Sequence, residues 1–269
     1  MTTVLRYDIG EIEPYINWIY FYHAWGLSGK PESEKARLRA DAETVLAEFK
    51  SRYHTHAVFG LFSANSDGDD IIIDGVRVPF LRQQTRKTDG SPNLCMADFI
   101  RPLSLGKADR IGVFATTVDA GMEKDYCDDD YLKIMSKTLA DRLAEATAEK
   151  MHEEVRRHYW GYAADEKLSI PEMLNAGYYG IRPAVGYPSM PDISINFILS
   201  ELVGMSEIGI RLTVSGAMQP HASVSGLMIA HPRASYFDVG PIGEDQLADY
   251  ASRRGIPVRM MRRFLSASL

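Results

Sequence analysis

The stretch that most constrains the fold is DDIIIDGVRVPF, residues 69–80, in which two apolar runs flank Asp74-Gly75. Asp-Gly in this setting predicts a two-residue hairpin, because a type I′ turn needs positive φ at both central residues. Residues 57–65 and 108–118 are β-prone runs nearby. Strands that follow one another through tight connections favour antiparallel pairing. The sequence therefore predicts an α+β fold rather than a doubly wound α/β fold.

Other segments have helical periodicity. Residues 32–53 repeat apolar side chains at helical spacing, and residues 131–159 carry a longer apolar stripe. Residues 243–255 form a third predicted helix, which Gly255 would close. Six aromatic residues crowd residues 15–25, which predicts a short buried element. Three more strands are expected at residues 209–216, 222–232 and 235–242. We find no convincing linker or internal repeat, so we expect one domain spanning residues 1–269.

Charge and composition exclude several classes of protein. The formal net charge is -6 and no block of Lys and Arg occurs, so nucleic acid is excluded as the first-choice partner. The chain begins without an apolar signal segment and has no stretch approaching the ~20 apolar residues that span a bilayer. Its two cysteines, Cys95 and Cys127, have neither C-x-x-C nor metal-type spacing. We expect a soluble, cytoplasmic protein with no membrane partner.

The familiar catalytic motifs are missing or misleading. GLSGK at residues 26–30 has the wrong spacing for a phosphate loop. His152 and His158 lie six residues apart, about 240° around a helix, so they cannot share a metal, and we interpret HEEVRRH as a solvated helix face. CDDDY at residues 127–131 is interpreted as a helix N-cap. A self-contained hydrolase or dehydrogenase is poorly supported, and we predict no metal site and no catalytic residue.

GIRPAVGYP, residues 180–188, is the segment with the most distinctive chemistry. Arg182 and Tyr187 each precede a proline, which holds both in extended backbone. Gly186 permits close approach of a ligand or another backbone, and Arg182 can bind a carboxylate through two parallel hydrogen bonds. The alternative is a rigid connector whose arginine pairs with a neighbouring Asp or Glu. Residue chemistry alone leaves both interpretations open.

Several segments resemble a known family, the activation domain of cobalamin-dependent methionine synthase. The matching segments occur in the family's order and include PYINW, GKADRIGVFATT, HYWGYA, GIRPAVGYP and ASVSGLMIAHPRASYF. The similarity runs from about Tyr15 to Leu265. It implies a C-shaped single domain with a bent antiparallel sheet flanked by helices. It also implies reactivation chemistry: a flavodoxin-type donor reduces cob(II)alamin, and S-adenosylmethionine then methylates the resulting cob(I)alamin on a corrinoid-binding module.

The resemblance also assigns residues of a site for S-adenosylmethionine. Arg182 would contact the ligand's carboxylate, and backbone from Ala184 through Gly186 to Tyr187 would line the site. Tyr187 would also lie close to the corrin. The Tyr236-Phe237 pair matches residues beside the ligand, in a separate part of the sequence.

Two further positions complete the implied site. Glu145 matches an acidic residue near the ligand's ammonium, although helical periodicity alone suggests a solvated glutamate. Asn17 stands where the family commonly has aspartate. Because Asn lacks the negative charge, we expect weaker binding of S-adenosylmethionine than is usual in the family.

The resemblance covers only the activation domain. We therefore expect an accessory subunit that acts in trans on methionine synthase and has no turnover of its own. Two alternatives remain: a reactivator of another corrinoid methyltransferase, and a docking module that has lost its ligand. Binding of S-adenosylmethionine would separate the second alternative from the others.

Overall fold

A six-stranded antiparallel sheet organises the structure, a computed structural model that describes residues 1–85 and 87–265. Its strands are β1 (Thr2–Asp8), β2 (His54–Asp67), β3 (Asp70–Ile73), β4 (Val76–Pro79), β5 (Asp109–Val118) and β8 (Ser223–Met228). The order is β4-β3-β2-β5-β8, and β1 pairs with β2 at residues 54–60 while β3 pairs with it at residues 64–67. The long strand β2 thus shares one edge between two partners, and the predicted antiparallel α+β fold is confirmed.

The hairpin predicted at Asp74-Gly75 connects β3 to β4. Ile73 is paired with Val76, and the two residues between them have φ of 51° and 87°. Positive φ at both central positions is the requirement of a type I′ turn. The turn predicted from Asp74-Gly75 is therefore confirmed.

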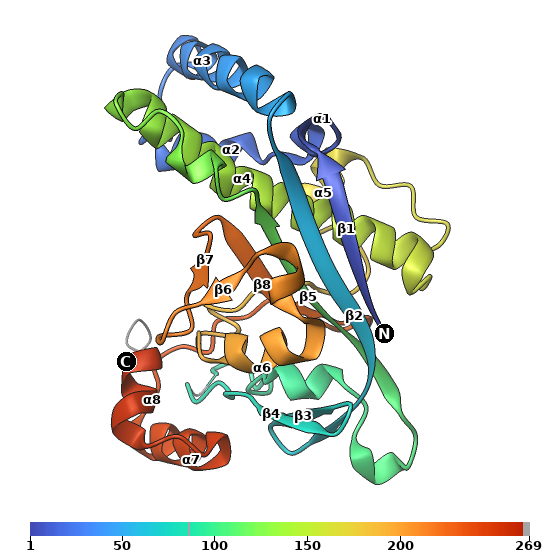
Figure 1. The fold of residues 1–269 in the computed structure, drawn as a ribbon. Helices are drawn as coiled ribbons and strands as arrows, with labels where there is room; N and C mark the ends of the chain where they lie inside the picture. Colours follow the sequence, from blue (N-terminus) through green and yellow to red (C-terminus); the bar gives the residue numbers. More distant parts are fainter. Residues whose placement is uncertain (86, 266–269) are drawn as a thin grey trace.

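Helices flank the sheet on both sides (Figure 1). They are α1 (Ile9–Ile12), α2 (Trp18–Ala24), α3 (Glu32–Lys50), α4 (Asp130–Glu154), α5 (Ile170–Leu174), α6 (Ile195–Val203), α7 (Glu244–Arg254) and α8 (Val258–Phe264), with a π-helical turn at Val155–Tyr159 directly after α4. Asp129 caps α4 by accepting a hydrogen bond from the N–H of Leu132, as predicted, and Gly255 ends α7 with φ 64°. Within the described part of the chain, no helix combines the length and the apolar character needed to cross a membrane.

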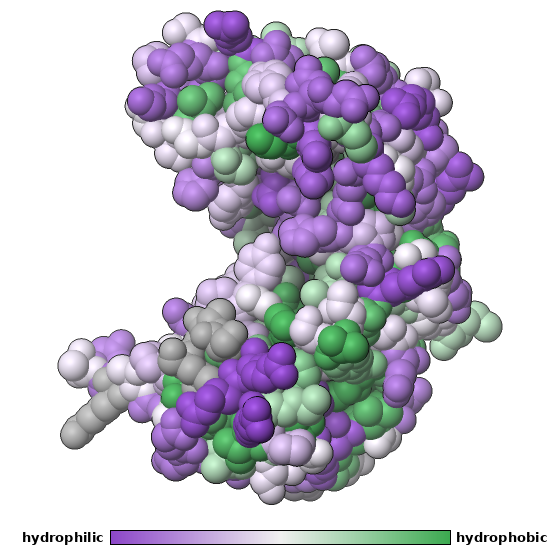
Figure 2. Space-filling view, turned by 60° about the vertical axis from the view of Figure 1, so that its left-hand side comes forward, coloured by the Kyte–Doolittle hydropathy of each residue, from purple (hydrophilic) through white to green (hydrophobic). Residues whose placement is uncertain are grey.

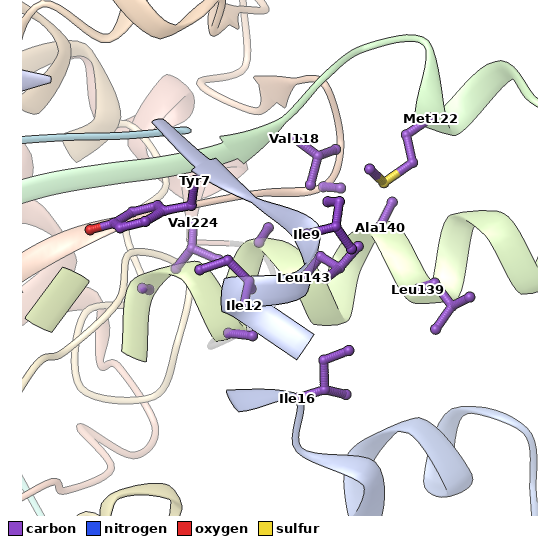
Figure 3. Close-up of a cluster of buried hydrophobic side chains, with 14 of the residues drawn as sticks. Tyr7, Ile9, Ile12, Ile16, Val118, Met122, Leu139, Ala140, Leu143 and Val224 are labelled. Carbon is purple, nitrogen blue, oxygen red and sulfur yellow. The ribbon is translucent and has the colours of Figure 1, made fainter. Parts of the chain in front are cut away.

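The alternation of side chains along β2 and β5 creates two cores, one on each face of the sheet. Phe59 and Phe114 face the core formed with α1, α3 and α4, whereas Val58 and Val113 face the core that includes α6. Figure 3 shows the first of these cores, where apolar side chains of the N-terminal segment lie beside α4. Each fully buried aliphatic side chain contributes about 1.5–3 kcal/mol to folding, so α4 is fixed firmly against the sheet.

The molecule has the C-shaped outline that the family resemblance implied. Figure 2 shows one side hollowed between an upper part, which holds α2, α3 and α4, and a lower part beneath it. The long strands β2 and β5 run between the two parts (Figure 1). The concave side therefore brings α4 close to segments from the C-terminal half of the chain.

Two strand predictions in the C-terminal third were wrong. Residues 209–216 provide only the two-residue strand β6 (Arg211–Leu212), which pairs with β7 (Met218–Gln219). Residues 235–242 form no strand, because their backbone bonds go elsewhere: the N–H of Phe237 donates to Ser189 Oγ. Strand composition predicted extended backbone there but could not supply a partner strand.

Two burial predictions also need correction. Tyr20, in the aromatic segment expected to be buried, is 60% exposed because α2 turns only one face inward. His152 was placed on a solvated helix face, yet it is fully buried and its ring packs edge-on against Tyr178 at 4.8 Å between centroids. The loop containing Tyr178 covers the side of α4 that periodicity assigned to water. His158 is exposed, as predicted.

Candidate ligand-binding site

A cavity of about 610 Å³ lies between α4 and the segment that contains Arg182. Its walls come from four parts of the chain: residues 15–20, the face of α4 from 142 to 149, residues 173–189 and residues 236–238. These parts are distant in sequence, and the C-shaped fold brings them together. Seven predicted site residues line this cavity: Asn17, Glu145, Arg182, Ala184, Tyr187, Tyr236 and Phe237.

The backbone around Arg182 lies against the edge of β8. Ile181 and Ile229 exchange two backbone hydrogen bonds of 2.9 Å, and the N–H of Leu227 donates to the carbonyl of Pro183 at 3.0 Å. This approach requires Gly226, because a Cβ there would lie 2.1 Å from the Pro183 oxygen. The segment is therefore stiff both from its prolines and from its pairing with the sheet.

Arg182 is buried and already has an acidic partner. Its Nη2 donates to Oε1 of Glu149, and its Nε is buried without a hydrogen-bond partner among the described residues. Burial alone would lower the pKa of Arg182, but the Glu149 carboxylate and the other acidic groups around the guanidinium together outweigh it, and the pKa is raised. The guanidinium thus stays charged. The arginine pairs with a glutamate, and it also lines a cavity.

Glu145 and Tyr187 meet across the cavity wall. The Tyr187 hydroxyl donates to Glu145 Oε1 at 2.7 Å, while the residue as a whole is 53% exposed. Burial of the hydroxyl and the nearby Glu145 charge raise the pKa of Tyr187, so it remains a neutral donor. Glu145 therefore lies on the cavity face of α4, as the family resemblance implied and helical periodicity did not.

Tyr236 links the wall to the backbone of the arginine segment. Its hydroxyl accepts a hydrogen bond from the N–H of Arg182 at 2.9 Å and lies 3.2 Å from the hydroxyl of Tyr178. The residue as a whole is 48% exposed and lines the cavity. Phe237 is held through its backbone by Ser189. Both aromatic residues line the same cavity as the buried Arg182.

Asn17 has a structural task that the sequence did not reveal. It is the N-cap of α2, and its Oδ1 accepts a hydrogen bond from the N–H of Ile19 at 3.2 Å. Gly186 does not line the cavity. It has φ 87° and donates its N–H to the carbonyl of Met190, so its visible role is to turn the chain after the arginine segment.

Other cavity residues were missed by the sequence analysis. Glu149 lies one helical turn after Glu145, a spacing that places both on the same face and could have identified it. Tyr178 arrives from a loop and had no sequence signal. Tyr15, Tyr20 and Arg142 are among the other lining residues that were not predicted.

The cavity has a definite chemical character. Carboxylates and guanidinium groups gather on the side formed by α4 and the arginine segment, and aromatic rings surround them. Such a site suits a small ligand that has charges of both signs at one end and an apolar or aromatic body. The fold and the cavity thus define a ligand-binding domain of the C-shaped α+β type.

Comparison with known proteins identifies the family. The model of the vitamin B12 dependent methionine synthase activation domain matches residues 8–255, so the chain belongs to that family. It is also similar to a solved structure, the crystal structure of the MetH reactivation domain bound to AdoHcy. The two are 41% identical with a TM-score of 0.92, and the match covers 100% of this chain and 90% of the other. The resemblance inferred from the sequence motifs is confirmed.

Proposed function

We propose that this chain binds S-adenosylmethionine in the Arg182 cavity and presents its methyl group to the cobalt of a corrinoid-binding module during reductive reactivation. The observation that carries the proposal is the buried guanidinium of Arg182 in a cavity wall that also holds carboxylates and tyrosines. The similar MetH reactivation domain, 41% identical, is bound to AdoHcy, the product that S-adenosylmethionine leaves after methyl transfer.

The residues divide the binding task between the two ends of the ligand. Arg182 would hold the carboxylate of the methionine part, since guanidinium and carboxylate match in geometry and charge. Tyr236 and Phe237 would lie beside the adenosyl part, and the backbone at Ala184 would complete the wall. Methyl transfer to a reduced cobalt needs the sulfonium methyl held in line, and positioning of this kind requires no general base.

The partners follow from the same proposal. Cobalamin would be carried by the corrinoid-binding module, and a flavodoxin-type protein would supply the electron. Tyr187 both lines the cavity and is half exposed, so it can contact the ligand and a docked corrin. Action in trans remains a prediction; mixing this chain with a separate corrinoid module and methyl-labelled S-adenosylmethionine under reducing conditions would test it by transfer of label to cobalt.

Calorimetric titration with S-adenosylmethionine tests the site itself. We expect one saturable site in the wild type and a loss of affinity of about 10- to 100-fold in Arg182→Ala, because hydrogen bonds to charged groups contribute about 1.5–3 kcal/mol. Arg37→Ala removes an exposed arginine of α3 and should bind like the wild type. No binding by the wild type, or equal binding by Arg182→Ala, would contradict the proposal and favour a docking module without ligand.

A further inference from the structure

Glu149 is a charged residue of the cavity wall whose role the family resemblance does not assign. We propose that it determines specificity: paired with Arg182, it makes the cavity select a ligand whose carboxylate is accompanied by an ammonium group. This inference rests on the proposed function, because it concerns the amino-acid end of S-adenosylmethionine.

The two glutamates on this face of α4 have different surroundings. Glu145 accepts a hydrogen bond from the hydroxyl of Tyr187. Glu149 contacts Arg182 through Oε1, while its Oε2 is buried and has no hydrogen-bond partner in residues 1–85 and 87–265. A buried carboxylate oxygen without a donor is unfavourable. Oε2 of Glu149 is therefore the acceptor that a ligand's donor group would satisfy with the greatest gain.

The charges around Arg182 explain why a carboxylate alone would bind poorly. Arg182 and Glu149 together are neutral, and both side chains are shielded from water, at 6% and 16% exposed. A ligand carboxylate that reaches Arg182 brings a second negative charge next to Glu149. In a site with little water this repulsion is weakly screened. Glu149 thus opposes simple carboxylates that the arginine on its own would accept.

An amino-acid ligand removes this repulsion. Its ammonium and carboxylate are attached to the same carbon atom, so the ammonium enters the site together with the carboxylate. Glu149 is in direct contact with Arg182, so it lies close to the place where the ammonium would be held. The ammonium would neutralise the added charge and donate to Oε2. Glu145 already accepts the Tyr187 hydroxyl, so it is the less suitable partner, although the family resemblance points to it.

The experiment compares AdoHcy with its deamino analogue, in which hydrogen replaces the α-amino group. Both ligands have the carboxylate and lack the sulfonium charge, so the ratio of their affinities measures what the ammonium group contributes to binding. Calorimetry on the full chain would give this ratio for the wild type, Glu149→Gln and Glu145→Gln. Glu154→Gln is the matched control on the same helix, because Glu154 accepts the Tyr7 hydroxyl and does not line the cavity.

We expect the wild type, Glu145→Gln and Glu154→Gln to prefer AdoHcy by about tenfold or more, and Glu149→Gln to prefer it by less than about threefold. An unchanged ratio in Glu149→Gln, or a ratio lost in Glu145→Gln instead, would overturn the inference. If Glu149→Gln does not fold, Glu149→Asp keeps the charge but withdraws it by one methylene. In that case Glu149→Asp must lower the preference for AdoHcy over the deamino analogue at least about threefold, and an unchanged preference would overturn the inference.

The outcomes also separate this inference from the proposed function. A wild type that binds AdoHcy with a ratio unaffected at Glu149 would refute the specificity role alone. A wild type that binds neither ligand would refute the proposed function and the inference with it.

Discussion

Two buried arginine–glutamate pairs lie near Tyr178, and they differ in how completely the arginine is used. Arg156 is 0% exposed and makes three nitrogen–oxygen contacts of 2.5–3.2 Å with Glu166. Arg182 makes one contact with Glu149 and lines the cavity. Arg156 keeps one buried nitrogen, Nη1, without a partner among the described residues, but its pair with Glu166 lies away from the cavity. We call it the closed pair, and its role is to stabilise the fold. A pair with unused hydrogen-bonding capacity at a cavity wall is suited to bind a ligand.

The largest effect that tests this comparison is loss of stability at the closed pair. Arg156→Ala leaves the buried carboxylate of Glu166 without its partner, and breaking such a pair costs about 3–5 kcal/mol. We expect urea denaturation to show this loss in the free energy of unfolding. Binding of S-adenosylmethionine by the folded fraction should change little. A stable Arg156→Ala that has lost binding would show that the closed pair belongs to the site.

A smaller effect concerns His152, whose charge state is influenced by both arginines. Burial, with added repulsion from Arg156 and Arg182, lowers its pKa well below 6.5. The folded chain therefore keeps His152 neutral, whereas the unfolded chain takes up a proton below about pH 6.5. The stability due to neutral His152 is present above that pH and is lost as the pH falls.

The loss of stability at low pH can be measured directly. Between pH 7 and pH 5.5 the wild type should lose about 1 kcal/mol of unfolding free energy because of His152. The loss measured for His152→Phe over the same interval should be smaller by about 1 kcal/mol. His158→Phe, which changes an exposed histidine a few residues away, should keep the wild-type pH dependence. Equal losses in the wild type and His152→Phe would contradict a buried neutral imidazole.

The smallest effect is at Asn17, on the wall formed by residues 15–20. Asn17→Asp adds a negative charge to the cavity and keeps the cap of α2, since aspartate caps helices as well as asparagine does. We expect S-adenosylmethionine to bind about two- to fivefold more tightly, as a partly exposed ion pair contributes about 0.2–1 kcal/mol. Calorimetry showing equal or weaker binding would contradict the expectation of a weakened site.

The sequence predicted the elements that depend on local signals. The Asp74-Gly75 hairpin requires only its own two residues, and α7 requires its periodicity and Gly255. Strands were harder, because residues 235–242 have strand composition but bond through their backbone to Ser189 and Pro188. A strand depends on a partner that its own sequence does not contain.

Part of the site could be predicted, from residues that restrict the backbone and from the family motif. Arg182 and Tyr187 were identified because each is followed by a proline, and the family motif added Glu145 and Tyr236. Glu149 was missed because helical periodicity shows which face meets the sheet but not which polar face meets a cavity. Its partnership with Arg182 arises only when the arginine segment is placed against β8.

A crystal structure of this chain grown with AdoHcy would test the proposed binding site most directly. We expect the ligand in the cavity between α4 and the arginine segment, with its carboxylate within hydrogen-bonding distance of the Arg182 guanidinium and its adenosyl part beside Tyr236. A ligand bound elsewhere, or one whose carboxylate points away from Arg182, would contradict the central claim that the half-used arginine pair is the binding group.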